Sequence, residues 1–171
     1  MYATMMFKAS IMDWLRQNGF NGIKTVMMSD SFGYEIDTHI INFGVCSLDV
    51  IGDWFEDFLL DNGCEYHDIP SPLLAFLHEL GHNQTVHDFT MEEVAWCKIL
   101  KNTIDPEHGR EHCNRYWSIP DEFRANEWVV DFINNNINAV IDLYKIYAKW
   151  WSLMENQDNI VYICGESGIR I

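Results

Sequence analysis

The residues His78-Glu79-Leu80-Gly81-His82 form an H-E-x-x-H motif inside an apolar stretch. Residues four apart lie on one face of a helix, so both imidazoles can reach the same metal ion. A catalytic zinc takes three protein ligands and leaves one position for water, whose pKa it lowers. Glu79 would lie beside that position, where a carboxylate can act as general base. The motif therefore predicts the zinc site of a metallopeptidase.

The sequence around the motif predicts a helix. Ser71 is the expected N-cap, and Pro72 suits the first helical position. Gly81 leaves the helix surface bare, so that a substrate or another backbone can come close. The alternative is a core helix whose histidines are hydrogen-bonded without a metal. The apolar stripe of the helix comprises Leu73, Phe76, Leu77 and Leu80.

Two histidines do not complete a zinc site, and the chain offers several third ligands. Asp88 follows His78 by the spacing used when a glycine-mediated turn returns the chain to the metal, but Thr85 stands at the turn position. His87 is one residue off that spacing. The alternative lies further along the chain, in the segment that begins near Ser118.

Glu122 is the preferred third ligand. It opens the apolar stripe of a predicted helix, and a carboxylate that faces a core needs a partner such as zinc. Asp121 is close enough in angle to remain a candidate, but it also suits the role of a capping residue. Glu127 lies on the far side of the helix. The other residues of the stripe are Ala125, Val129 and Phe132.

The rest of the chain predicts an α+β fold. We expect a mainly helical, compact, zincin-like domain over residues 1–171, with a small antiparallel sheet packed on the H-E-x-x-H helix. Strands are expected over 22–28 and 34–43 as a hairpin, and a strand-like tail over 160–171. A loop over 102–117 carries Tyr116, His108 and His112; each of them either faces solvent or donates a hydrogen bond to an oxyanion at the zinc. Helices are expected over 3–18, 47–60, 90–101, 118–134 and 136–154.

Composition restricts the function classes. The chain has 171 residues, of which 11 are basic and 26 acidic, giving a net charge of −15. This charge opposes binding to nucleic acid or anionic lipid and favours a basic partner. No apolar run has the length of a membrane span and the start does not have a signal peptide's layout, so we expect a cytoplasmic protein. The five cysteines have no C-x-x-C spacing, which indicates neither a disulfide framework nor a cysteine zinc site.

The motif at His78–His82, followed by Tyr116-Trp-Ser-Ile-Pro-Asp-Glu122-Phe-Arg-Ala125-Asn126-Glu-Trp128, resembles the ImmA/IrrE family of zinc metallopeptidases, which includes small phage-encoded members. The resemblance covers residues 22–134, and no DNA-binding module accompanies it. It implies a gluzincin-like domain in which His78, His82 and Glu122 hold zinc and Glu79 is the general base. Members of the family cleave proteins, often repressors.

Two functions follow as expectations. The first is an intracellular zinc-dependent peptidase that hydrolyses a peptide bond in a specific protein substrate, such as a repressor or host regulator. The second is an acidic phage or mobile-element interaction protein whose zinc site is structural and which binds and inhibits a basic partner. Glu79 separates the two, because a structural site has no use for a carboxylate at that position.

Overall fold

The computed structural model describes residues 2–45, 49–105 and 108–155. The architecture is α+β, mainly helical with one small three-stranded sheet. The chain divides into two compact units, the first within Met1–Asp49 and Asn138–Ile171 and the second within Val50–Ile137. This division does not test the expectation of a single domain over residues 1–171, which stays a prediction. None of the helices in the described ranges is long and apolar enough to cross a membrane.

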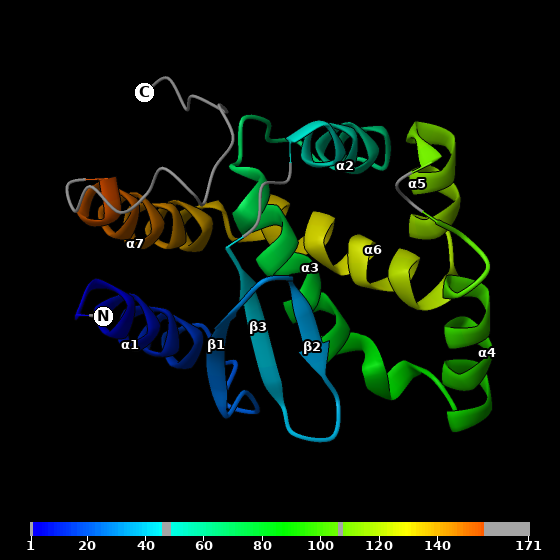
Figure 1. Ribbon diagram of the computed structural model, residues 1–171, viewed down its shortest axis with the longest axis horizontal. Coiled ribbons are helices and arrows are strands. Elements are labelled where there is room, and N and C mark those ends of the chain that lie inside the picture. The colour runs from blue at the N-terminus through cyan, green and yellow to red at the C-terminus, as the bar shows by residue number, and fades with distance from the viewer. Residues whose placement is uncertain (1, 46–48, 106–107, 156–171) are drawn as a thin grey trace. The chain divides into compact units, whose positions relative to one another are not determined.

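The first unit contains a mixed sheet with the strand order β1-β3-β2 (Figure 1). Its strands are β1 (Thr25–Ser29), β2 (Gly33–Glu35) and β3 (Ile40–Gly44). Strand β3 pairs parallel to β1 and antiparallel to β2, so the antiparallel pairing predicted between 22–28 and 34–43 is wrong. The chain turns between Glu35 and Ile40, where His39 has a positive φ of 56°. What reads as one strand over 34–43 is therefore the hairpin of β2 and β3.

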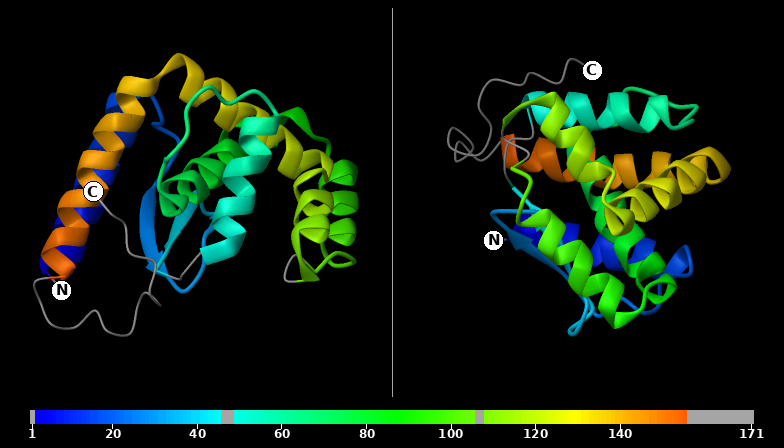
Figure 2. Two further views of the ribbon diagram at one scale, coloured as in Figure 1. Left: turned by 90° about the horizontal axis from the view of Figure 1, so that it is seen from above. Right: turned by 90° about the vertical axis from the view of Figure 1, so that its right-hand side faces the viewer.

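Two helices, α1 (Tyr2–Gln17) and α7 (Ile137–Glu155), lie side by side in this unit (Figures 1 and 2). They confirm the helices predicted over 3–18 and 136–154. Phe7 of α1 stacks on Trp150 of α7 with ring centroids 4.5 Å apart, and it meets Phe43 of β3 edge-on at 5.1 Å. These buried aromatic rings form the core that joins both helices to the sheet.

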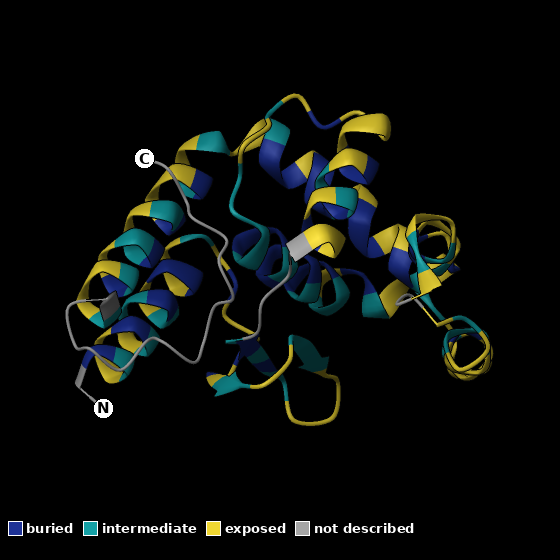
Figure 3. Ribbon diagram, turned by 45° about the horizontal axis from the view of Figure 1, so that its top comes forward, coloured by how far each residue is buried: buried dark blue, intermediate teal, exposed yellow. Residues whose placement is uncertain are grey.

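The second unit is helical in the described residues. Helices α3 and α6 pack against each other at its centre, and α4 and α5 lie at the N-terminal end of α6 (Figures 1 and 2). Buried residues follow the inner faces of α3 and α6, whereas α4 is largely exposed (Figure 3). The elements are α2 (Asp49–Asp61), α3 (Ser71–Thr85), the 3-10 turn η1 (Val86–Asp88), α4 (Met91–Lys101), α5 (Arg110–Trp117) and α6 (Pro120–Asn135).

The ends of these helices correct several predictions. Thr90 caps α4, in a capping box with Glu93, and so agrees with the helix predicted over 90–101. Ser71 is not the cap of α3, because Pro70 is its N-cap, and Ile119 is the N-cap of α6 with no side-chain hydrogen bond. A proline in the first turn of each helix suits this arrangement, since it has no N–H to satisfy.

The loop predicted over 102–117 is wrong in its second half, which forms α5. Two other expected segments, the first two residues of the helix predicted over 47–60 and the strand-like tail over 160–171, lie outside the described residues.

Candidate metal centre

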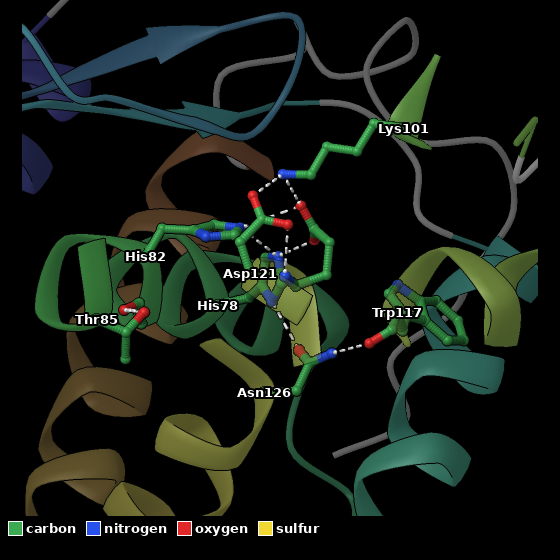
Figure 4. A network of polar contacts seen from close by, with 9 residues as sticks. His78, His82, Thr85, Lys101, Trp117, Asp121 and Asn126 are labelled. Carbon is green, nitrogen blue, oxygen red and sulfur yellow. Dashed lines mark hydrogen bonds and ion pairs between the residues drawn. The ribbon is translucent and has the colours of Figure 1, made fainter. Parts of the chain in front are cut away.

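Helix α3 and the first turn of α6 bring His78, His82 and Glu122 together (Figure 4). His78 Nε2 lies 2.9 Å from Glu122 Oε2 and 3.1 Å from His82 Nε2. His82 Nε2 lies 3.4 Å from Glu122 Oε1. In the part of the chain that the structure describes, these are the only three potential metal ligands whose donor atoms converge, all within 4.8 Å of one another. The structure thus brings together the three residues predicted as zinc ligands.

The donor set and its spacing fit a zinc ion. Two imidazoles and one carboxylate are a ligand combination of catalytic zinc sites, which keep the fourth position open. With bonds of about 2.0–2.2 Å, ligand atoms around a tetrahedral zinc lie about 3.3–3.6 Å apart. The observed separations of 2.9–3.4 Å require only small side-chain shifts to reach that geometry.

Asn126 orients His78. Its Oδ1 lies 2.7 Å from His78 Nδ1, and its Nδ2 donates to the Trp117 carbonyl at 3.5 Å (Figure 4). Because the amide nitrogen faces a carbonyl, the amide oxygen accepts the proton of His78 Nδ1. That leaves the lone pair of Nε2 directed at the other two ligands. On another side, the ring of Phe55 from α2 packs edge-on against His78 at 5.5 Å.

Gly81 allows α3 and α6 to approach closely enough for this convergence. A Cβ atom at Gly81 would lie 2.7 Å from the Ala125 carbonyl oxygen and 3.2 Å from the Ala125 Cα. The bare helix surface predicted at Gly81 is therefore occupied by another backbone, that of α6.

Burial and charge keep Glu122 ionised. Its side chain is 3% exposed, and burial alone would raise its pKa. Hydrogen bonds from His78 and His82 outweigh burial and hold the pKa of Glu122 well below its usual value. For His78, burial alone would lower the pKa, but the hydrogen bond and the charge of Glu122 raise it to about 9. The Glu122 carboxylate and the His78 imidazole thus favour each other's charged forms.

Lys101 at the end of α4 supplies a further cation. Its Nζ contacts Glu122 Oε1 and lies 2.7 Å from Asp121 Oδ2 (Figure 4). Burial alone would lower the pKa of Lys101, but the charge of Glu122 and hydrogen bonds to both carboxylates raise it, so the ammonium stays charged. Asp121 therefore pairs with Lys101 through Oδ2, while its Oδ1 accepts the backbone N–H of Glu122 at 3.0 Å in the first turn of α6.

Sequence reasoning missed the parts played by Lys101 and Asn126. Asn126 follows Glu122 by four residues, which places both on one face of α6, and this spacing was a usable signal. The sequence contains no comparable signal for Lys101, because a lysine in the last turn of a helix is common.

Glu79 and Tyr116 lie beside the convergent ligands. Glu79 is half-buried on α3, and its charge acts on both His78 and Tyr116. Tyr116, on α5, is also half-buried. Burial, and then the charge of Glu122, raise the pKa of its phenol, which stays protonated. Tyr116 is therefore a neutral phenol within range of the charges of Glu122 and Glu79.

The other candidate residues lie apart from the group. Asp88 is exposed and pairs with Arg124 at 3.0 Å, and His87 is exposed as well. Glu127 is exposed and also pairs with Arg124, as its predicted position on the far side of α6 requires.

His108, just before α5, and His112, within α5, are not part of the group either. His108 pairs with Asp105 at 2.7 Å, and the rings of His108 and His112 stack at 5.5 Å.

Comparison of the chain with protein-family models, curated proteins and solved structures finds no match. The motif and the geometry of the site are therefore the basis for a functional proposal.

Proposed function

We propose that this protein is a zinc-dependent metallopeptidase that hydrolyses a peptide bond in a specific protein substrate. The observation that supports it is the convergence of His78, His82 and Glu122 on one point, with Glu79 on the next residue of the same helix turn. We further propose that the helical unit is a zincin-like domain of the ImmA/IrrE type, because the order and spacing of these residues resemble that family.

Each residue has a separate role in this proposal. His78, His82 and Glu122 would hold a zinc ion, which would supply Lewis-acid activation of a water molecule and of the substrate carbonyl. Glu79 would take a proton from the attacking water and pass it to the leaving amine. Tyr116, neutral and half-buried, donates a hydrogen bond to the oxyanion of the substrate. Asn126 keeps His78 in the tautomer that can bind the metal.

The charge distribution supports a basic substrate segment. Residues 50–137 contain 17 acidic and five basic residues, so most of the net charge of −15 belongs to the unit that carries the site. Such a surface attracts cationic chains and repels nucleic acid. A repressor or host regulator in the cytoplasm, which the family resemblance suggests, is a protein of the required kind.

The same acidity favours a second candidate function. An interaction protein with a structural zinc could use this surface to bind and inhibit a basic partner. The two functions differ in their need for Glu79, because only hydrolysis requires a proton acceptor next to the metal.

Metal analysis tests the site. We expect one zinc per chain in the purified protein, and loss of zinc in His78→Ala and in Glu122→Ala, each of which removes a proposed ligand. Asp88→Ala is the matched control, because Asp88 is an exposed carboxylate that pairs with Arg124 instead. A protein that contains no zinc and cannot be loaded with it would contradict the proposal.

Glu79→Gln tests catalysis. The amide keeps the size of the side chain but cannot accept the proton, so the variant should retain zinc and its fold while cleavage falls by about 10²–10⁴-fold. Comparing new protein N-termini in cells that express wild type or Glu79→Gln would identify the substrate. Identical N-termini in both, with the variant still acting on its host, would favour the interaction protein.

A further inference from the structure

Among the residues that the structure describes, Lys101 is the one charged side chain in contact with Glu122 for which the proposed mechanism has no use. Its ammonium lies against Oε1 of Glu122, while Oε2 of the same carboxylate faces His78. The Lys101 side chain is 25% exposed and that of Asp121 18%, so this ion pair is largely shielded from water. Placing a lysine in this way costs side-chain entropy and hydration, so some other interaction must offset that cost.

The metal-free protein has a need that Lys101 meets. The Glu122 side chain is only 3% exposed, and a buried carboxylate without a cation is strongly destabilising. Two of its partners are the imidazoles of His78 and His82, which must be neutral to bind a metal. Lys101 is not a metal ligand and need not lose its proton when a metal binds, so its ammonium, in direct contact with Oε1, adds a counter-ion for Glu122 beside His78.

The same charge has the opposite effect on a bound cation. An ammonium that contacts one oxygen of a carboxylate is close to any ion bound by that carboxylate, and like charges in a partly buried site repel. It also occupies Oε1 of Glu122, which leaves Oε2 as the oxygen directed at His78. Asp121 provides a second anion for Lys101, so the ammonium retains a partner when the charge of Glu122 is taken up by a metal.

We propose that Lys101 is an internal competitor of the metal ion: it neutralises Glu122 in the metal-free protein and lowers the affinity of the site for a divalent cation. This inference rests on the proposed metal site. On this inference, zinc would take over from Lys101 as the main counter-ion of Glu122 when it binds. A purely structural role, in which Lys101 only anchors Glu122, has the opposite consequence, because removal of an anchor weakens metal binding.

The affinity for zinc, measured by competition with a chelator of known affinity, separates these roles. Lys101→Met removes the charge and keeps the apolar stem, and it should raise zinc affinity at least about tenfold. Lys101→Arg keeps the charge and should stay near wild type. Lys98→Met is the matched control: it removes an exposed lysine from the same helix, and its affinity should change by no more than about twofold because exposed charges are screened.

Thermal unfolding with and without added zinc gives a second measurement. Lys101→Met should lower the Tm of the metal-free protein, because Glu122 loses its permanent counter-ion. Added zinc should raise the Tm by more in this variant than in wild type, because tighter binding to the folded state stabilises it further. If Lys101→Met does not fold, Lys101→Gln replaces it, since its amide can still donate to both carboxylates without a charge.

The outcomes distinguish this inference from the proposed function. Zinc affinity that is unchanged or weaker in the uncharged variants, while wild type binds zinc, would overturn the role of Lys101 and leave the metal site in place. Failure of both wild type and Lys101→Met to bind zinc would contradict the metal site itself. Higher zinc affinity in Lys101→Met and Lys101→Gln, but not in Lys101→Arg or Lys98→Met, would support the role of Lys101 as a competitor of the metal.

Discussion

Asn126 connects the candidate metal site to the backbone of α5. It is 1% exposed and joins the His78 imidazole to the Trp117 carbonyl at the end of that helix. A histidine ligand commonly donates its second N–H to such a partner, which fixes the tautomer and the ring orientation. The angle at which Nε2 of His78 faces the other ligands therefore depends on a residue that does not itself touch the metal position.

Asn126→Leu should weaken zinc binding by about 10–100-fold, because leucine has a similar size but cannot accept the His78 proton. The unpaired N–H should also lower the free energy of unfolding by about 1–3 kcal/mol. Chelator competition and urea denaturation measure the two effects. Asn135→Leu, a change at an exposed position of the same helix, is the control. Equal zinc affinity in Asn126→Leu and wild type would show that His78 keeps its orientation without the amide.

At the residue scale the sequence was informative where chemistry depends on helical spacing. His78 and His82 are four residues apart, and Glu122 opens an apolar stripe, so their convergence could be expected from periodicity. Lys101 could not be predicted, because its contact depends on how the end of α4 meets the start of α6. Such a contact between helices leaves no trace in the spacing of either segment.

At the scale of elements, the α3–α6 contact sets the geometry of the site. Two ligands lie on α3 and one on α6, so the separation of the helices fixes the distance between imidazoles and carboxylate. At Gly81 the two backbones are close enough that a Cβ would meet a carbonyl oxygen at 2.7 Å. Backbone atoms in a packed helix pair cannot move aside as a flexible side chain can.

Gly81→Ala should therefore destabilise the protein, although alanine is the better helix former. Overpacking costs typically about 1–3 kcal/mol, against a gain of about 1 kcal/mol in helix propensity. We expect a net loss of about 1–2 kcal/mol in urea denaturation, together with weaker zinc binding because α6 is displaced. Gln84→Ala, at an exposed position of α3, is the control and should be neutral. Full stability and full zinc affinity in Gly81→Ala would show that the helices accommodate a methyl group.

Elements with strong periodicity could be predicted, and those that depend on pairing could not. The long helices α1, α6 and α7 have apolar stripes that the sequence displays. The prediction of the sheet was wrong for two reasons. The strand-like alternation over 34–43 hides a turn that ends at His39. No local sequence feature specifies that β3 pairs in parallel with β1. Helix α5 was missed because its eight residues are mostly polar and follow a glycine.

At the scale of the whole molecule, acidic residues outnumber basic ones by 26 to 11. Several of the basic side chains are also engaged with carboxylates. Besides Lys101, the ion pairs in the described residues include Arg16 with Asp13, Arg110 with Asp57, Arg124 with Asp88 and Lys145 with Asp142. Pairs of this kind distribute positive charge singly over the surface, each next to an anion.

This distribution predicts no measurable binding to duplex DNA at physiological salt. Affinity for DNA comes mainly from lysine and arginine side chains that displace counter-ions from phosphates, and it needs several of them on one face. Fluorescence anisotropy of a labelled duplex, titrated with protein at about 0.15 M salt, should stay flat up to micromolar concentrations. The same titration with a basic peptide of the suspected substrate should rise, and this rise should weaken as salt is added, because attraction between opposite charges is screened. A saturable signal with DNA that unlabelled duplex competes away would contradict the prediction and point to a nucleic-acid partner that net charge does not reveal.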